Sequence, residues 1–127
     1  MNYEVHTQRV TAVQIDLTLV KDGTETLATL SIQYKKEKSE LFIKGFKPGF
    51  SGEFTRSTGK TPGEALFEYA VSMYGNNANG VVIKGNIEHI IGARTAEHFE
   101  KIGILEFVEE NVWLVTPEAA KKLNPNF

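Results

Sequence analysis

The first third of the chain alternates hydrophobic and polar residues with a period of two. Val13 to Leu19 follows this alternation, and Ala28 to Tyr34 repeats it after the turn-forming Lys21-Asp22-Gly23. Alternation of this kind is typical of half-buried β-strands. A third apolar run, Ser39 to Phe46, follows the lysine-rich turn at residues 35–38. The pattern therefore predicts an antiparallel meander.

The third strand is expected to be interrupted and then to continue. Lys47-Pro48-Gly49 has the composition of a turn or a β-bulge. Beyond it, we expect Gly52 to Arg56 to resume the strand.

The hydrophobic spacing changes to the helical period after Thr61. Thr61 supplies a capping hydroxyl, Pro62 suits the first helical position, and Glu64 lies three residues after the cap. The apolar residues that follow recur at helical spacing: Leu66, Tyr69, Ala70 and Met73. Gly75 fits the end of this helix, and residues 76–80 have the composition of a loop.

The last third combines short strands and helices, and only Asn86 to Gly92 is ambiguous. The predicted elements are a strand from Gly80 to Lys84, a helix from Thr95 (its cap) to Ile102, a hairpin of Ile104 to Val108 and Val112 to Val115, and a short helix begun by Thr116-Pro117. Gly103 ends the second helix. The order predicts one α+β domain, residues 1–127, with a mainly antiparallel, mixed sheet and two principal helices.

Composition narrows the classes of function. The net charge of −2 gives no electrostatic footprint for holding phosphates, which disfavours nucleic-acid binding. The absence of cysteine excludes disulfides, thiolate zinc sites and a cysteine nucleophile. The three histidines have no metal-ligand spacing. The N-terminus has no signal-like segment and no apolar run is long enough to span a bilayer, so we expect a soluble, cytoplasmic protein.

Two segments carry a resemblance to a known family. Arg56-Ser57-Thr58-Gly59-Lys60-Thr61 resembles a Gln/Arg-x-x-Gly-x-Gly/Ala loop. Ala96 to Ile104 resembles a helix with the motif Ala-x-x-Phe/Leu-Tyr-Glu-Lys-Leu-Gly-Phe. Together with the order of elements from Leu41 to Val115, they are similar to the GNAT family of N-acetyltransferases. That family binds acetyl-CoA where two central parallel strands splay apart.

The resemblance implies roles for particular residues. Four residues would hold the pyrophosphate of acetyl-CoA at a helix N-terminus: Arg56, Gly59, Lys60 and Thr61. Phe99 would lie near the cofactor. In an enzyme of this kind, Glu53 would remove the proton from an acceptor amine and His98 would serve as the acid.

Departures from the family pattern keep a second interpretation open. Thr61 stands where the family has a small residue, Pro62 removes an amide donor, and Glu64 places a carboxylate where an anion should dock. Phe99 replaces a frequent proton-donating tyrosine. The alternative is a non-catalytic interaction module, an adaptor or inhibitor that binds a protein partner through residues around Glu109 to Trp113.

The C-terminal part also resembles a winged helix, in which Phe99 to Phe107 and then Asn111 to Ala120 would form the recognition helix, the β wing and the closing helix. Glutamates crowd the surface that would face DNA: Glu97, Glu100, Glu106, Glu109 and Glu110. This charge disfavours a DNA-binding role. The residues do not indicate an acceptor amine, a partner or an oligomeric state.

Overall fold

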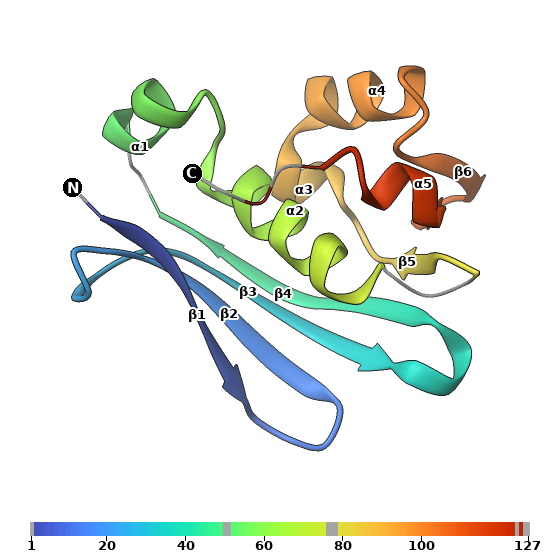
Figure 1. The fold of residues 1–127 in the computed structure, drawn as a ribbon, viewed down its shortest axis with the longest axis horizontal. Coiled ribbons are helices and arrows are strands. Elements are labelled where there is room, and N and C mark those ends of the chain that lie inside the picture. Colours follow the sequence, from blue (N-terminus) through green and yellow to red (C-terminus); the bar gives the residue numbers. More distant parts are fainter. Residues whose placement is uncertain (1, 50–51, 76–78, 124, 126–127) are drawn as a thin grey trace.

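The computed structural model describes residues 2–49, 52–75, 79–123 and 125. Within them the fold is α+β, with one seven-stranded, mostly antiparallel mixed sheet and five α-helices (Figure 1). The strands are β1 (Tyr3–Arg9), β2 (Gln14–Lys21), β3 (Glu25–Lys35), β4 (Glu40–Pro48), β5 (Val81–Lys84), β6 (Glu106–Glu109) and β7 (Val112–Val115). The helices are α1 (Gly52–Thr58), α2 (Pro62–Tyr74), α3 (Glu88–Ile91), α4 (Ala93–Lys101) and α5 (Pro117–Ala120), and Lys36–Lys38 forms a 3-10 turn.

The strands lie in the order β1-β2-β3-β4-β5-β7-β6. Strands β1 to β4 form the predicted antiparallel meander, which is confirmed. The next pair, β4 and β5, is parallel, because α1 and α2 carry the chain back across the sheet before β5 begins. Strand β7 then pairs antiparallel with β5, and β6 forms the edge.

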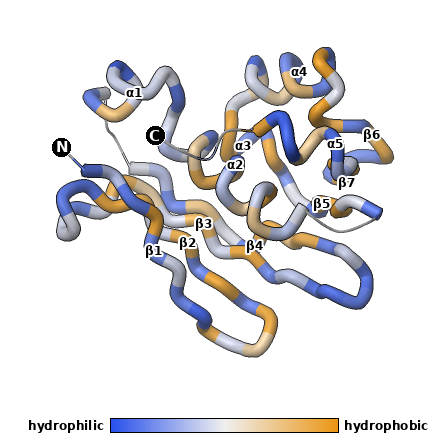
Figure 2. Tube along the Cα trace, in the orientation of Figure 1, coloured by the Kyte–Doolittle hydropathy of each residue, from blue (hydrophilic) through white to orange (hydrophobic). Residues whose placement is uncertain are grey.

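The helices gather on one side of the sheet (Figure 1). Burial alternates along much of β2 and β3, and Figure 2 shows hydrophobic and hydrophilic stretches in both layers. The apolar side chains of the sheet form one buried cluster with those of the helices. Fully buried members come from both layers, among them Leu17, Leu30, Leu41, Leu66 and Phe67. Burying each such side chain contributes about 1.5–3 kcal/mol, so the contact between the meander and α2 stabilises the fold.

Both predicted threonine-proline helix starts are confirmed. The Thr61 hydroxyl accepts a hydrogen bond from the Glu64 amide at 3.2 Å, and the Thr116 hydroxyl accepts one from the Ala119 amide at 3.2 Å. Pro62 and Pro117 follow at the first helical positions, where the missing N–H has no helical partner to lose. Local chemistry alone thus places the starts of α2 and α5.

The prediction that Gly52 to Arg56 resumes the third strand is wrong, because these residues belong to α1. Five residues are too few to separate a strand period from a helical turn. The decisive contact is tertiary: Phe54 is fully buried, with its ring edge-on to Tyr3 of β1 at 4.9 Å between centroids. The predicted turn or bulge at Lys47-Pro48-Gly49 is also displaced, because β4 runs to Pro48 and the register shifts earlier, between Ser31 and Ile32 of β3.

Two further helix expectations need correction. Helix α4 begins at Ala93, after Gly92, so Thr95 lies inside the helix and does not cap it. The ambiguous segment forms α3, where the Asn86 side chain accepts a hydrogen bond from the His89 amide at 3.3 Å. A side chain that bonds an amide three residues later is a helix-start signal. Recognition of this signal would have resolved the segment from sequence.

Strand β1 was not foreseen because most of its side chains are exposed. It pairs along its whole length with β2, and only Tyr3 and Val5 pack against the core. A strand at a sheet edge needs few apolar residues, so its sequence pattern is weak. Among the described residues, no helix is both long and apolar enough to cross a bilayer.

Candidate functional site

The parallel strands β4 and β5 pair only briefly. The register joins Glu40 to Val82 and Phe42 to Lys84, and β5 ends there. Beyond this point, Gly85 packs so closely on Ile43 that a Cβ atom on Gly85 would lie 2.7 Å from the Ile43 Cβ. Strand β4 continues to Pro48, and no described strand pairs with this side of it after Phe42. The backbone edge of β4 therefore borders a gap in the sheet.

A cavity of about 230 Å³ lies at this gap. Its walls come from three elements: Phe46, Pro48 and Gly49 at the end of β4, Thr61 to Gly63 at the start of α2, and His89 to Gly92 in and after α3. The His89 ring meets the Phe46 ring edge-on, with centroids 5.9 Å apart. The cavity thus joins an aromatic wall to the N-terminal end of a thirteen-residue helix.

Gly63 brings α2 and α3 together at the back of the cavity. A Cβ atom at this position would lie 2.1 Å from the Ile90 carbonyl oxygen and 2.9 Å from the Phe46 ring. Only a residue without a side chain permits this approach. The glycine therefore sets the distance between two of the cavity walls.

The predicted pyrophosphate loop does not join a strand to a helix, since α1 precedes it and α2 follows it. Its amides already have partners: Gly59 N donates to the Thr55 carbonyl at 2.8 Å, and Lys60 N donates to the Thr58 hydroxyl at 3.2 Å. The Thr61 hydroxyl is used by the α2 cap. A phosphate bound here would have to replace these hydrogen bonds.

Lys60 lies in an ion pair with Glu68 of α2. The two side chains are 18% and 7% exposed, so the pair is largely withdrawn from water. A buried carboxylate requires a nearby cation. The position of Lys60 is accounted for by this pairing.

Glu64 lies half-buried on the first turn of α2. Burial, followed by the charge of Glu68, raises the pKa of the Glu64 carboxyl above its ordinary value, and Lys60 partly opposes the shift. The native state then holds this proton more tightly than the unfolded chain does. The contribution of Glu64 to the free energy of unfolding is therefore lost as the pH rises from about 4.5 through the raised pKa.

We expect Glu64→Gln to stabilise the protein relative to the parent at about pH 7, and to have less effect at about pH 4, where the parent carboxyl is protonated. Urea denaturation at both pH values measures the difference. Glu118→Gln is the matched control, because Glu118 is an exposed carboxylate in the first turn of α5. If the gain in the free energy of unfolding from Glu64→Gln, relative to that from Glu118→Gln, does not increase with pH, the raised pKa of Glu64 is contradicted.

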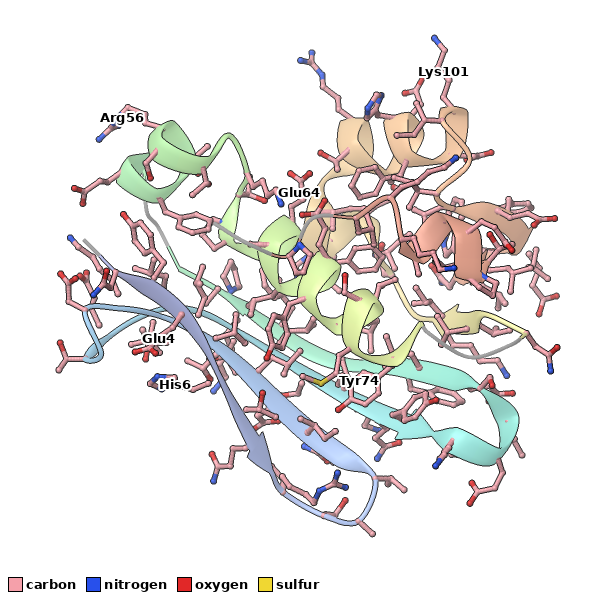
Figure 3. The ribbon with its side chains drawn as sticks, in the orientation of Figure 1. Glu4, His6, Arg56, Glu64, Tyr74 and Lys101 are labelled. Atoms are coloured by element: carbon pink, nitrogen blue, oxygen red, sulfur yellow. The ribbon has the colours of Figure 1, made fainter. Side chains whose placement is uncertain are left out.

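Glu53 and Arg56 both lie on α1, away from the cavity walls. Glu53 Oε2 accepts a hydrogen bond from Lys21 Nζ at 3.0 Å, which ties α1 to β2. This bond and the Glu53 charge raise the pKa of Lys21. Arg56 points outward from α1 (Figure 3), on the opposite side of the molecule from Lys101 on α4. The structure thus gives Glu53 a tethering contact and leaves Arg56 at the surface.

His98 and Phe99 are neighbours on α4 but face different surroundings. His98 is exposed, whereas Phe99 is 5% exposed and belongs to the core cluster. The Phe99 carbonyl also accepts hydrogen bonds from the amides of Ile104 and Leu105. Of all the predicted site residues, only Thr61 lines the cavity.

Sequence reasoning missed most of the cavity residues, among them Phe46, His89 and Gly92. His89 had been weighed only as a metal ligand, and within the described residues no three metal-ligating side chains come together. Sequence spacing offered no link between Phe46 and His89, which lie 43 positions apart and meet only because β4 and β5 are parallel. Asn86, whose side chain accepts a hydrogen bond from the His89 amide just before α3, is a local signal near them.

The C-terminal hairpin forms part of the large sheet. Strand β7 pairs with β5 along Val81 to Lys84, where the winged-helix interpretation expects a separate wing. The glutamates of β6, Glu106 and Glu109, are exposed. No protein-family model matches the chain, and no curated protein is similar to it.

Proposed function

We propose that the domain binds the acyl-pantetheine arm of an acyl-CoA in the cavity between β4 and α3, and transfers the acyl group to an amine. The observation that carries this proposal is the unpaired edge of β4 beside the cavity. An extended ligand with amide groups pairs with such an edge as an added strand would. Pantetheine is an extended chain with two amides.

The size and lining of the cavity support a slender ligand. Its volume of about 230 Å³ is below the 300–1,000 Å³ of pockets for drug-sized ligands. Phe46, Ile90 and Ile91 supply apolar contact for methylene groups. The start of α2 adds the positive end of a helix dipole near the thioester oxygen or the diphosphate. The parallel pairing of β4 with β5 is in keeping with the GNAT resemblance.

The reaction requires little beyond positioning. The amine nitrogen attacks the thioester carbonyl carbon, the N–C bond forms, and the C–S bond breaks. The amine loses a proton and the departing sulfur gains one. His89 lies in the cavity wall, and an imidazole can both donate and accept a hydrogen bond through its two ring nitrogens. We assign to His89 the orientation of the thioester and proton transfer to the sulfur.

We expect acetyl-CoA to bind with a Kd in the micromolar range, about 8 kcal/mol, when titrated by calorimetry with acetate as the control. S-acetylpantetheine, which lacks the diphosphate, should bind within about tenfold of acetyl-CoA, because the loop amides are already bonded. Absence of heat with both thioesters at about 1 mM, in folded protein, would contradict the proposal.

His89→Ala is expected to weaken acetyl-CoA binding about tenfold, the loss of one good contact. His98→Ala is the matched control, since His98 is exposed on α4 and lines no part of the cavity. If His98 is the acid, as the sequence resemblance implies, His98→Ala should slow thiol release in the presence of a primary amine more than His89→Ala does. The pair of variants therefore distinguishes the two assignments.

A further inference from the structure

The sheet ends at β6 in a strand with exposed hydrophobic side chains. No described strand pairs with the outer side of β6 (Figure 1). Two of the four residues of β6 are exposed hydrophobic residues: Phe107 is 56% exposed and Val108 is 55% exposed. The unpaired backbone groups of an edge strand can accept another strand. The pairing of β6 with β7 has an irregularity between Phe107 and Glu109, so the regular part of this edge is short. Exposed apolar side chains on an unpaired edge mark an interaction surface.

A cavity of about 440 Å³ opens beside this edge. Phe107, Trp113 and Ile87 form its apolar side. The Phe107 ring stands edge-on to Trp113 with centroids 5.5 Å apart, and Trp113 itself is only 8% exposed. This arrangement offers a rigid aromatic surface against which one apolar side chain can be buried. Aromatic anchors of this type contribute most of the energy in many interfaces.

The rim of this surface is acidic. Glu88 and Glu110 line the cavity, and Glu106 and Glu109 lie on β6. All four are exposed, and no ion pair joins any of them to a described residue. A second copy of this chain, pairing β6 against β6, would bring glutamates against glutamates, which is destabilising. A positively charged strand would instead be attracted and held in register.

We propose that the edge of β6 binds an extended, basic segment of a partner protein, which pairs with the β6 backbone and buries one apolar side chain against Phe107 and Trp113. Lysines or arginines on alternate positions of the segment face the glutamates of the rim. This binding mode is strand addition, in which the backbone supplies affinity and the pocket supplies specificity. The surface is distinct from the β4–α3 cavity, because the two cavities share no lining residue.

The test uses a seven-residue peptide that alternates lysine with valine and phenylalanine, and a matched peptide with glutamate in place of lysine. Titration into isotope-labelled protein is followed by amide chemical shifts. We expect the lysine peptide to shift the amides of Glu106 to Glu109, with a Kd below about 100 µM that weakens at least tenfold in about 0.5 M salt. The glutamate peptide should leave these amides unchanged.

Phe107→Ser is expected to weaken the lysine peptide about tenfold or more. Ile102→Ser is the matched control, because Ile102 is also exposed, at 45%, but lies outside β6. Acetyl-CoA binding should be the same in both variants, so failure of this proposal is distinguishable from failure of the proposed function.

Three results would each overturn the proposal. One is absence of shifts in β6 at about 1 mM lysine peptide, and another is equal binding of the two peptides. The third is a concentration-dependent dimer in sedimentation that Phe107→Ser dissociates, which would make a second copy the occupant of this edge.

Discussion

Lys60→Met is expected to lower the free energy of unfolding by about 3–5 kcal/mol. The substitution preserves much of the side-chain volume but removes the cation from the Glu68 carboxylate, whose side chain is 7% exposed. An uncompensated buried charge is among the most destabilising changes in a folded protein. Urea denaturation near neutral pH measures the effect.

Two variants complete this experiment. Lys60→Met with Glu68→Leu removes both charges and should recover most of the lost stability. Lys38→Met controls for loss of a lysine at an exposed position. If Lys60→Met costs less than about 1 kcal/mol, the pair is behaving as an exposed salt bridge and the structural role is refuted.

The double variant also separates two roles for Lys60. The sequence resemblance assigns Lys60 to the pyrophosphate of acetyl-CoA, whereas the structure pairs it with Glu68. We expect the folded double variant to bind acetyl-CoA with affinity within about threefold of the parent, because the proposed ligand site is formed by β4, α2 and α3. A loss of a hundredfold or more would restore Lys60 to the phosphate site.

Gly63→Ala is expected to destabilise the protein by about 2 kcal/mol or more. The added methyl would lie 2.1 Å from the Ile90 carbonyl oxygen, and backbone must move to admit it. Helix propensity alone predicts the opposite sign, since alanine exceeds glycine by about 1 kcal/mol in a helix. The direction of the change therefore tests the packing of α2 on α3.

Gly45→Ala is the matched control for this substitution. A Cβ atom at Gly45 meets nothing within 4 Å, and its backbone is not in the left-handed region. It should change the free energy of unfolding by less than about 0.5 kcal/mol. Thermal or urea unfolding compares the two variants directly. Equal stability of Gly63→Ala and the parent would show that the two helices lie further apart than described.

Gly63→Ala should weaken acetyl-CoA binding, whereas Gly45→Ala should leave it unchanged. Gly63 sets the spacing of two cavity walls, while Gly45 lies within β4 and lines no part of the cavity. A Gly63→Ala protein that is folded at low temperature yet binds acetyl-CoA like the parent would place the ligand elsewhere.

Local patterns account for most of the secondary structure. Alternation over Val13 to Leu19 and Ala28 to Tyr34 marked β2 and β3, and the Thr61 and Thr116 caps marked α2 and α5. The failures were segments whose structure depends on distant partners. Strand β1 is held by pairing with β2, and α1 is held by the burial of Phe54 against Tyr3.

The candidate site was less accessible to sequence reasoning. Thr61 was identified because a helix start is a local signal. Glu53 and Lys60 were assigned by resemblance, yet each is paired within the fold, with Lys21 and Glu68 respectively. The roles proposed for His98 and Phe99 remain predictions; the structure places His98 at the surface and Phe99 in the core.

The amino-acid sequence alone establishes an α+β chain, its antiparallel meander and the start of its long helix, because periodicity and capping act over a few residues. The parallel pairing of β4 with β5, the cavity between Phe46 and His89, and the exposed edge at β6 arise only in the tertiary structure. Each depends on contacts between residues far apart in the chain. Such contacts are set by the packing of one shared core. No single segment of the sequence is enough to determine that packing.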